Sequence, residues 1–187
     1  MIRILAGEAR GRPIKSPPKG PASRPILGRM KKSLFDILAR RLPEAVFLDL
    51  FAGTGSVGIE ALSRGASRVI FVERDSYCSR LLRENLETLG YTDRAEIIGG
   101  DVLRALESLG SSFDLIFMGP PYKTEEGGAA AHTEPVLQSL VRCRVLRPGG
   151  WLIAQHHSKE SFSVPSGYVM ARQEKYGDSR LSFFQNA

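Results

Sequence analysis

The residues whose types and spacing suggest chemistry begin with a glycine-rich turn and an acid that follows it. Gly53, Gly55 and Gly58 come directly after a short apolar run, residues 46–50. Glycines let the backbone turn tightly and approach a ligand closely, and a helix that begins here points its N–H groups at an anionic or carboxylate-bearing ligand. Glu73 follows Gly53 by 20 residues, the spacing at which an acid reaches the hydroxyl pair of a ribose. These residues predict a nucleotide-like ligand, and the glycine pattern by itself fits a nicotinamide cofactor as well as other nucleotides.

A second group of residues, Gly119-Pro120-Pro121-Tyr122, follows the apolar run 113–118. Two consecutive prolines fix the backbone, expose a carbonyl without a competing N–H, and direct the aromatic ring that comes next. A site for a flat nucleobase amine could use this arrangement, because the ring stacks on the base and carbonyl oxygens orient its NH2 group. A nicotinamide enzyme has no comparable use for it.

Asp101 is a third candidate, which follows another strand-like run. It could accept a hydrogen bond from the exocyclic amine of an adenine. The alternative is that it serves only as the N-cap of the helix that begins at Val102.

The elements that must position these residues alternate strictly between strand and helix from residue 46 onward. This pattern indicates a Rossmann-like α/β fold, in which a mostly parallel sheet carries helices on both faces and binds ligands beyond the carboxyl ends of its strands. The candidate residues all fall at such ends. The last two apolar runs have no helix between them, so they should form an antiparallel hairpin at the sheet edge. The expected strands are 46–50, 68–72, 95–98, 113–118, 151–155, 168–175 and 181–185, and the main expected helices are 57–64, 76–89 and 134–143.

The first 43 residues differ from the rest in composition and charge. Residues 1–41 hold 11 Lys and Arg against two acids and carry a net charge of +9, whereas the remainder carries −3. Their pattern predicts a β-hairpin over 2–14, a proline-rich connector and an amphipathic basic helix over 29–42. We therefore expect two parts, 1–43 and 44–187, and we expect the basic part to bind a polyanion. The candidate nucleic-acid-binding residues are Arg10, Arg12, Lys15, Arg24 and Arg29. The competing interpretation is that the hairpin simply packs on the sheet as structure.

Composition excludes several other classes of protein. The chain has enough apolar residues, 42%, for one domain with a proper core, but no run of 18 that could span a membrane. Residues 1–12 lack the apolar stretch of a secretory signal. Cys78 and Cys143 are far apart and have no metal-ligand spacing, which is typical of reduced thiols in a cytoplasmic protein. We expect no metal, because the three histidines also lack ligand spacing.

Two sets of motifs together resemble a known family. The first set is similar to S-adenosylmethionine-dependent methyltransferases that act on amines: Asp49-x-Phe51-x-Gly53-x-Gly55, Glu73, Gly100-Asp101 and Pro120-Pro121-Tyr122. The second set is similar, in order and spacing over nearly the whole chain, to the bacterial small-subunit ribosomal RNA guanine-N2 methyltransferases of the RsmD type: Arg24-Pro25, Leu34-Phe35-Asp36-Ile37-Leu38, residues 51–58 and Tyr176-Gly177-Asp178. The combination is specific, whereas the single motifs are not.

The resemblance implies the seven-stranded methyltransferase sheet, a monomer, and S-adenosylmethionine as the cofactor. The methyl acceptor would be the N2 amine of a specific guanine in 16S rRNA, presented as RNA or as a small-subunit assembly particle. The cofactor-binding residues would be Asp49, Phe51, Gly53, Gly55, Glu73, Arg74, Asp101 and Val102. The catalytic residues would be Gly119, Pro120, Pro121 and Tyr122.

The chain departs from the family pattern at a position that touches the chemistry. The family's Pro-Pro tetrad begins with Asp or Asn, and here Gly119 stands in that place. Gly28 and Lys32 also replace acidic residues that are usual before the helix at Leu34. Three interpretations stay open: a guanine-N2 methyltransferase of rRNA, a methyltransferase for another amine such as a DNA adenine or a protein glutamine, and a cofactor-binding assembly protein with weak or no catalysis.

Overall fold

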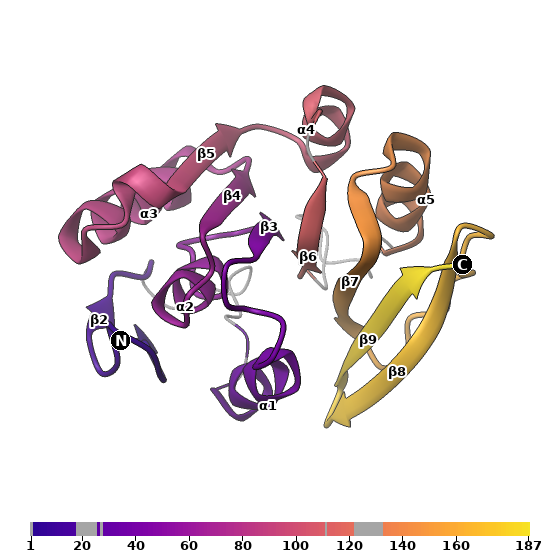
Figure 1. Cartoon of the computed structure of the whole chain (residues 1–187), viewed down its shortest axis with the longest axis horizontal. Coiled ribbons are helices and arrows are strands. Elements are labelled where there is room, and N and C mark those ends of the chain that lie inside the picture. The colour runs from indigo at the N-terminus through magenta and orange to yellow at the C-terminus, as the bar shows by residue number, and fades with distance from the viewer. Residues whose placement is uncertain (1, 18–25, 27, 111, 122–132) are drawn as a thin grey trace.

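The computed structural model describes residues 2–17, 26, 28–110, 112–121 and 133–187. A seven-stranded sheet in the order β5-β4-β3-β6-β7-β9-β8 forms its centre (Figure 1). The strands are β3 (Val46–Leu50), β4 (Arg68–Glu73), β5 (Ala95–Gly99), β6 (Phe113–Met118), β7 (Leu146–His157), β8 (Tyr168–Tyr176) and β9 (Ser179–Asn186). The first five strands pair in parallel, and β9 pairs antiparallel with β7 and β8. The structure confirms the predicted fold class.

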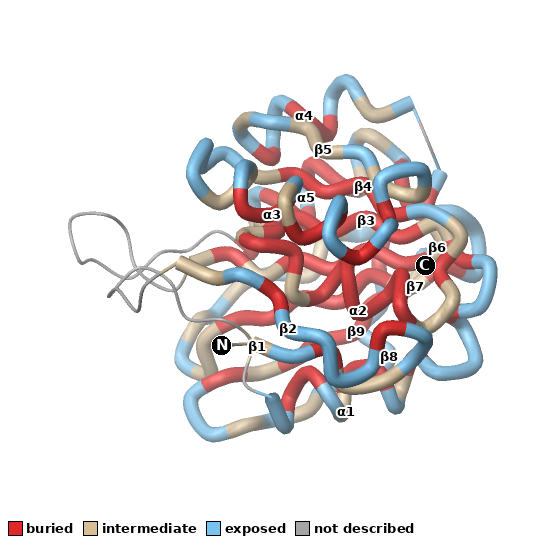
Figure 2. Tube along the Cα trace, turned by 90° about the vertical axis from the view of Figure 1, so that its left-hand side faces the viewer, coloured by how far each residue is buried: buried red, intermediate tan, exposed pale blue. Residues whose placement is uncertain are grey.

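Helices cover both faces of the sheet. Successive side chains of a strand point to opposite faces, so apolar residues on both faces need a covering layer. Phe47 and Phe117 pack on one face against α1 (Gly28–Leu38), α2 (Gly58–Ser63) and α3 (Ser76–Leu89). Leu48 and Met118 pack on the other against α4 (Val102–Ser108) and α5 (Thr133–Cys143). Figure 2 shows the buried residues concentrated in the central strands. No helix of the described residues is long and apolar enough to cross a membrane.

The beginning of β7 differs from the expected strand, which started at residue 151. Leu146 already pairs with Phe113, and the register then shifts before Leu115 pairs with Trp151. The segment Arg147-Pro148-Gly149-Gly150 has the composition of a turn, so sequence pattern alone ends the strand there. The extra residues are accommodated as an irregularity inside one strand.

The N-terminal hairpin packs into the same core as the sheet. Its strands, β1 (Ile2–Arg3) and β2 (Pro13–Ile14), pair antiparallel. Ile4, Ala9 and Ile14 are buried in the cluster that contains α1, α2 and α3. Between the two strands, the N–H of Glu8 donates to the carbonyl of Ser63 at 2.8 Å. The hairpin therefore packs on the body of the protein, as the structural interpretation of this segment predicted.

Candidate active site

The glycine-rich turn follows β3 at the carboxyl rim of the sheet. Gly53 and Gly55 in this turn have different surroundings. Gly53 (φ 57°) and Gly55 (φ 84°) both adopt a left-handed backbone that favours glycine. A Cβ atom on Gly55 would lie 2.4 Å from Cδ1 of Leu82, so this glycine lets the turn pack against α3. A Cβ atom on Gly53 would meet no atom of the described chain within 4 Å. The face of Gly53 is therefore the one that a ligand can approach closely.

Glu73, at the end of β4, is held against this turn. Its Oε2 accepts a hydrogen bond from the N–H of Gly53 at 2.7 Å, and its Oε1 accepts one from the N–H of Asp75 at 2.8 Å. The side chain is half-buried. An ionised carboxylate has about four acceptor positions, so two N–H donors leave capacity for two ribose hydroxyls. The structure thus brings together the acid and the turn that the sequence predicted to share a ligand.

Asp49 lies beneath the turn, with a side chain that is only 1% exposed. Its Oδ2 accepts a hydrogen bond from the N–H of Gly58, the first residue of α2, at 2.8 Å. Burial raises the pKa of Asp49 to about 7, the Gly58 hydrogen bond opposes this, and the nearby charge of Glu73 adds to it. In the described structure, Asp49 is a residue that positions the turn.

Asp101 lies at the next strand end and is exposed. Its Oδ1 accepts hydrogen bonds from the N–H groups of Leu103 and Arg104 at 3.0 and 3.3 Å, which confirms that it is the N-cap of α4. The N–H of Gly100 donates to the carbonyl of Glu73 at 3.1 Å and ties the two strand ends together. The Val102 side chain is buried in the core beneath. Capping does not exhaust the carboxylate, which keeps acceptor positions on the solvent side.

The Pro-Pro turn lies on the other side of β3 from Glu73, because β3 separates β4 from β6 in the sheet. The N–H of Gly119 donates to the carbonyl of Leu50 at 3.4 Å, which keeps this segment beside the end of β3. Pro120 is buried and Pro121 is half-buried. Tyr122 lies outside the described residues. The arrangement is that of a topological switch point, where open α/β sheets bind their ligands.

Sequence reasoning missed Gln155, a polar residue at the carboxyl end of β7. It is only 9% exposed, and its Oε1 lies 3.7 Å from the position that a Cβ atom on Gly119 would occupy. The signal was a glutamine at the end of the apolar run 151–154. Its distance to Gly119 depends on how β6 and β7 pair, and one sequence does not state that register.

The predicted RNA-binding residues fall into two groups. Arg12 and Lys15 hold the hairpin to α3, through the Thr88 carbonyl at 2.5 Å and Glu84 Oε2 at 2.8 Å respectively. Arg10 and Arg29 are exposed, whereas Arg24 lies outside the described residues.

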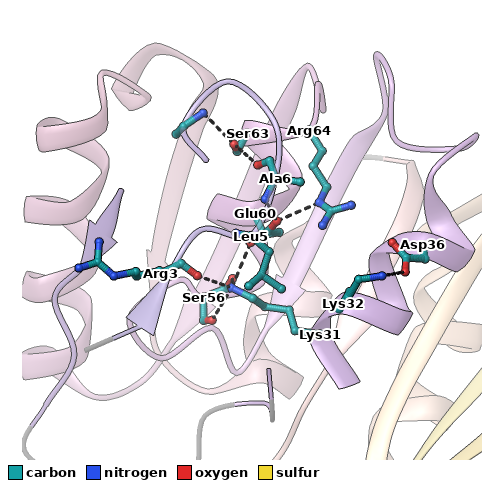
Figure 3. Close-up of polar contacts among 11 residues, drawn as sticks. Arg3, Leu5, Ala6, Lys31, Lys32, Asp36, Ser56, Glu60, Ser63 and Arg64 are labelled. Atoms are coloured by element: carbon teal, nitrogen blue, oxygen red, sulfur yellow. Dashed lines mark hydrogen bonds and ion pairs between the residues drawn. The ribbon is translucent and has the colours of Figure 1, made fainter. Parts of the chain in front are cut away.

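A groove of about 380 Å³ runs between the hairpin and α1. Its lining includes the basic residues Arg29, Lys32 and Arg64, together with Asp36, whose Oδ2 pairs with the Lys32 ammonium at 2.7 Å. Figure 3 shows Arg64 and Lys32 on the same side of Leu5, with Arg64 above Lys32 in this view. The groove thus carries a basic surface on the same part of the molecule as the two exposed arginines.

A metal centre has no support in the part of the chain that the structure describes, where no group of three or more His, Cys, Asp or Glu side chains could hold an ion. His156 is 1% exposed, and its Nε2 lies 2.8 Å from Oγ of Ser182. Burial lowers the pKa of His156. This histidine is therefore part of a buried polar contact between β7 and β9.

The sheet and its rim define the class of the protein. Five parallel strands followed by an antiparallel hairpin form the methyltransferase sheet. The rim adds a glycine-rich turn bonded to an acid on one side of β3 and a Pro-Pro turn on the other.

The family follows from comparison with known proteins. Residues 2–185 match the model of the family described as Conserved hypothetical protein 95, and the chain belongs to this family, the RsmD family. It is 36% identical over 191 residues to ribosomal RNA small subunit methyltransferase D of Escherichia coli (strain K12), covering 98% of this chain and 89% of that relative. It is 30% identical over 190 residues to the protein of that name from Haemophilus influenzae, covering 99% and 94%.

Solved structures agree with this assignment. The chain is similar to yhhF from Escherichia coli, with a TM-score of 0.84 and 28% identity over 99% of this chain and 97% of that one. It is also similar to a protein of Thermus thermophilus, with a TM-score of 0.78 and 33% identity over 98% of each chain.

Proposed function

We propose that this protein transfers a methyl group from S-adenosylmethionine to the N2 amine of a guanine in small-subunit ribosomal RNA. The observation that carries the proposal is the placement of the Pro-Pro turn across β3 from the Glu73–Gly53 pair. On this proposal, the nucleobase-amine site lies beside the ribose site. The names of the Escherichia coli and Haemophilus influenzae relatives support rRNA of the small subunit as the substrate. On this proposal the protein acts as a monomer in the cytoplasm.

The residues of the rim fit S-adenosylmethionine, which supplies a methyl group on a sulfonium. Glu73 would hold the ribose hydroxyls, and Asp101 would accept from the adenine amine. The open face of Gly53 gives the close backbone approach that such a ligand needs. Phe51, Gly55, Arg74 and Val102 complete the proposed cofactor site, and Asp49 fixes the turn from below.

The remaining residues act on the acceptor amine. The lone pair of a guanine N2 is delocalised into the ring, so the amine is a poor nucleophile. Carbonyl oxygens at Gly119 and Pro120 would accept its N–H bonds and favour the pyramidal nitrogen that attacks. Tyr122 would stack on the base. Positioning of this kind supplies most of the acceleration of an in-line displacement.

The test is methyl transfer from labelled cofactor to small-subunit particles and to naked 16S rRNA, followed by nucleoside analysis. Label in N2-methylguanosine is the expected result. Parallel reactions with duplex DNA and with a glutamine-containing protein, analysed for labelled nucleosides and amino acids, test the other amines: label in DNA adenine or in protein glutamine would assign one of them. Cofactor binding without transfer to any of these substrates would assign an assembly role.

A further inference from the structure

The vacant acceptor position at Gly119 has a neighbour on the adjacent strand. β6 and β7 lie side by side in the sheet (Figure 1), and Met118 pairs with Ala154. Gly119 follows Met118, and Gln155 follows Ala154, so these two residues lie next to each other at the carboxyl rim. β7 continues to His157, which gives Gln155 a fixed backbone while β6 has already ended.

Both residues face the same side of the sheet. Phe117 and Ile153 pack in the cluster with α1, α2 and α3, whereas Met118 and Ala154 pack in the opposite one. Alternation therefore turns the side chain of Gln155 to the α1 side. A Cβ atom on Gly119 would point to the same side, 3.1 Å from Cε1 of Phe117 and 3.7 Å from Oε1 of Gln155.

The oxygen of Gln155 is close to where the family's own acceptor would be. From covalent geometry, the side-chain oxygen of an Asp or Asn lies about 2.4 Å from its Cβ. Oε1 of Gln155 at 3.7 Å from that Cβ position is thus in the same part of the rim. A glutamine amide oxygen is a neutral acceptor, as the amide oxygen of Asn is. At 9% exposure, its motion and its competition with water are restricted.

We propose that Gln155 replaces the missing side chain at position 119 and accepts one N–H of the target amine through Oε1. This inference rests on the proposed function. The N2 lone pair forms the new N–C bond as the S–C bond breaks and leaves its electron pair on sulfur. N2 then releases one proton to water, since an amide oxygen does not take it. Gln155 holds the amine through this step and is a catalytic residue.

The experiment compares Gln155→Leu, Gln155→Glu and Gly119→Asn, alone and combined, in transfer to small-subunit particles. Gln155→Leu should lower kcat about 100- to 1,000-fold, as the loss of one positioned hydrogen-bond partner does. KM for particles and calorimetric affinity for the cofactor should stay within about twofold, because on this proposal Gln155 acts on the reacting amine rather than in the cofactor site. Adding Gly119→Asn to Gln155→Leu should restore most of the lost turnover. Gln155→Glu should stay active and gain a pH dependence from its carboxylate.

The matched control is Gln185→Leu, in the same sheet. Gln185 pairs with Val169 of β8, beside the Leu152–Phe184 pair and away from the carboxyl rim. It should leave turnover unchanged. Melting curves identify unfolded variants, and if Gln155→Leu unfolds, Gln155→Glu and its pH profile decide the matter.

Turnover of folded Gln155→Leu within twofold of the native value would overturn the inference, and so would failure of Gly119→Asn to rescue it. These ratios are read on whichever nucleoside the native chain labels. The absence of N2-methylguanosine in the native reaction therefore contradicts the proposed function separately. Absence of any transfer would overturn both.

Discussion

The ammonium of Lys31 lies 3.1 Å from Oε2 of Glu60, and both side chains are buried, at 2% and 0% exposure. Glu60 also accepts hydrogen bonds from the N–H groups of Leu5 and Ala6, at 2.8 and 3.0 Å, and from Nε of Arg64 at 2.9 Å (Figure 3). One carboxylate on α2 therefore joins α1 and the N-terminal hairpin. The pKa of Lys31 is lowered from its ordinary value, because the effect of burial exceeds the opposing effect of the Glu60 charge.

Glu60→Ala should lower the free energy of unfolding by about 3–5 kcal/mol, because it leaves the buried Lys31 ammonium without its carboxylate partner and removes the acceptor of two partly buried N–H groups. Urea denaturation measures this. Glu84→Gln is the matched control, since it breaks the exposed Lys15–Glu84 pair and should hardly change stability. Equal effects of the two variants would contradict the bracing role of Glu60. Removal of residues 1–20 should also lower the melting temperature, because it takes Ile4, Ala9 and Ile14 from the core.

Glu73→Ala should weaken S-adenosylmethionine binding by about 2–3 kcal/mol, as for a charge-assisted pair of hydrogen bonds. Because Glu73 also holds the N–H of Gly53, part of the loss comes from the turn. The cofactor affinity of Glu73→Gln should lie between that of the native chain and that of Glu73→Ala. Calorimetry measures the affinity, with Glu87→Gln on α3 as the control. Undisturbed cofactor affinity in Glu73→Ala, or tight NADH binding by the native chain, would refute the site.

Tyr122→Ala should cut methyl transfer strongly while cofactor affinity stays nearly intact, because base–aromatic stacking is worth about 1–3 kcal/mol. Tyr122→Phe keeps the ring and should retain most of the activity. Single-turnover kinetics on small-subunit particles would show the difference. Equal activity of the Ala and Phe variants would remove the ring from the mechanism.

The raised pKa of Asp49 makes stability depend on pH in a defined direction. The folded protein holds this proton up to about pH 7, whereas an ordinary Asp releases it near 3.8. The contribution of Asp49 to the free energy of unfolding is therefore full below the ordinary pKa and is lost as the pH rises through about 7. Asp49→Asn keeps an acceptor for the Gly58 N–H and should flatten the fall across this window. Denaturation of both forms at several pH values checks it, and parallel curves would contradict it.

Arg10→Ala with Arg29→Ala should weaken RNA binding and reduce its dependence on salt, by up to about 0.7–0.9 log units of slope for each phosphate that the variant no longer neutralises. Both residues are exposed, so melting should not change. Arg142→Ala on α5 is the control, because Arg142 pairs with Glu107 on the helices that cover the opposite face of the sheet. An unchanged slope in the double variant would place the RNA surface elsewhere.

Much of the fold is readable from the sequence because the central parallel strands β3, β4 and β6 are almost wholly buried and therefore appear as short apolar runs. The strand 113–118 and the helix 76–89 match β6 and α3 in full. The proximity of Glu73 to the turn at Gly53 is also predictable, because an acid 20 residues after the first glycine of such a turn is a recurring spacing in nucleotide sites. The burial of Lys31 was not predictable, because a lysine in a basic helix suggests a solvated face. Only the structure shows that Lys31 packs against Glu60. The proximity of Gln155 to Gly119 was not predictable either, because it depends on how β6 pairs with β7.

The position of β9 between β7 and β8 has a consequence for how the protein is made. During synthesis, residues 168–176 leave the ribosome before residues 179–186, yet in the described structure β8 reaches the sheet only through β9. Until β9 has been synthesised, β8 therefore lacks the strand with which it pairs. Val169 and Met170 of β8 are exposed in the folded protein as well. The spatial order of the strands at this edge, β7-β9-β8, therefore differs from the order in which they are translated.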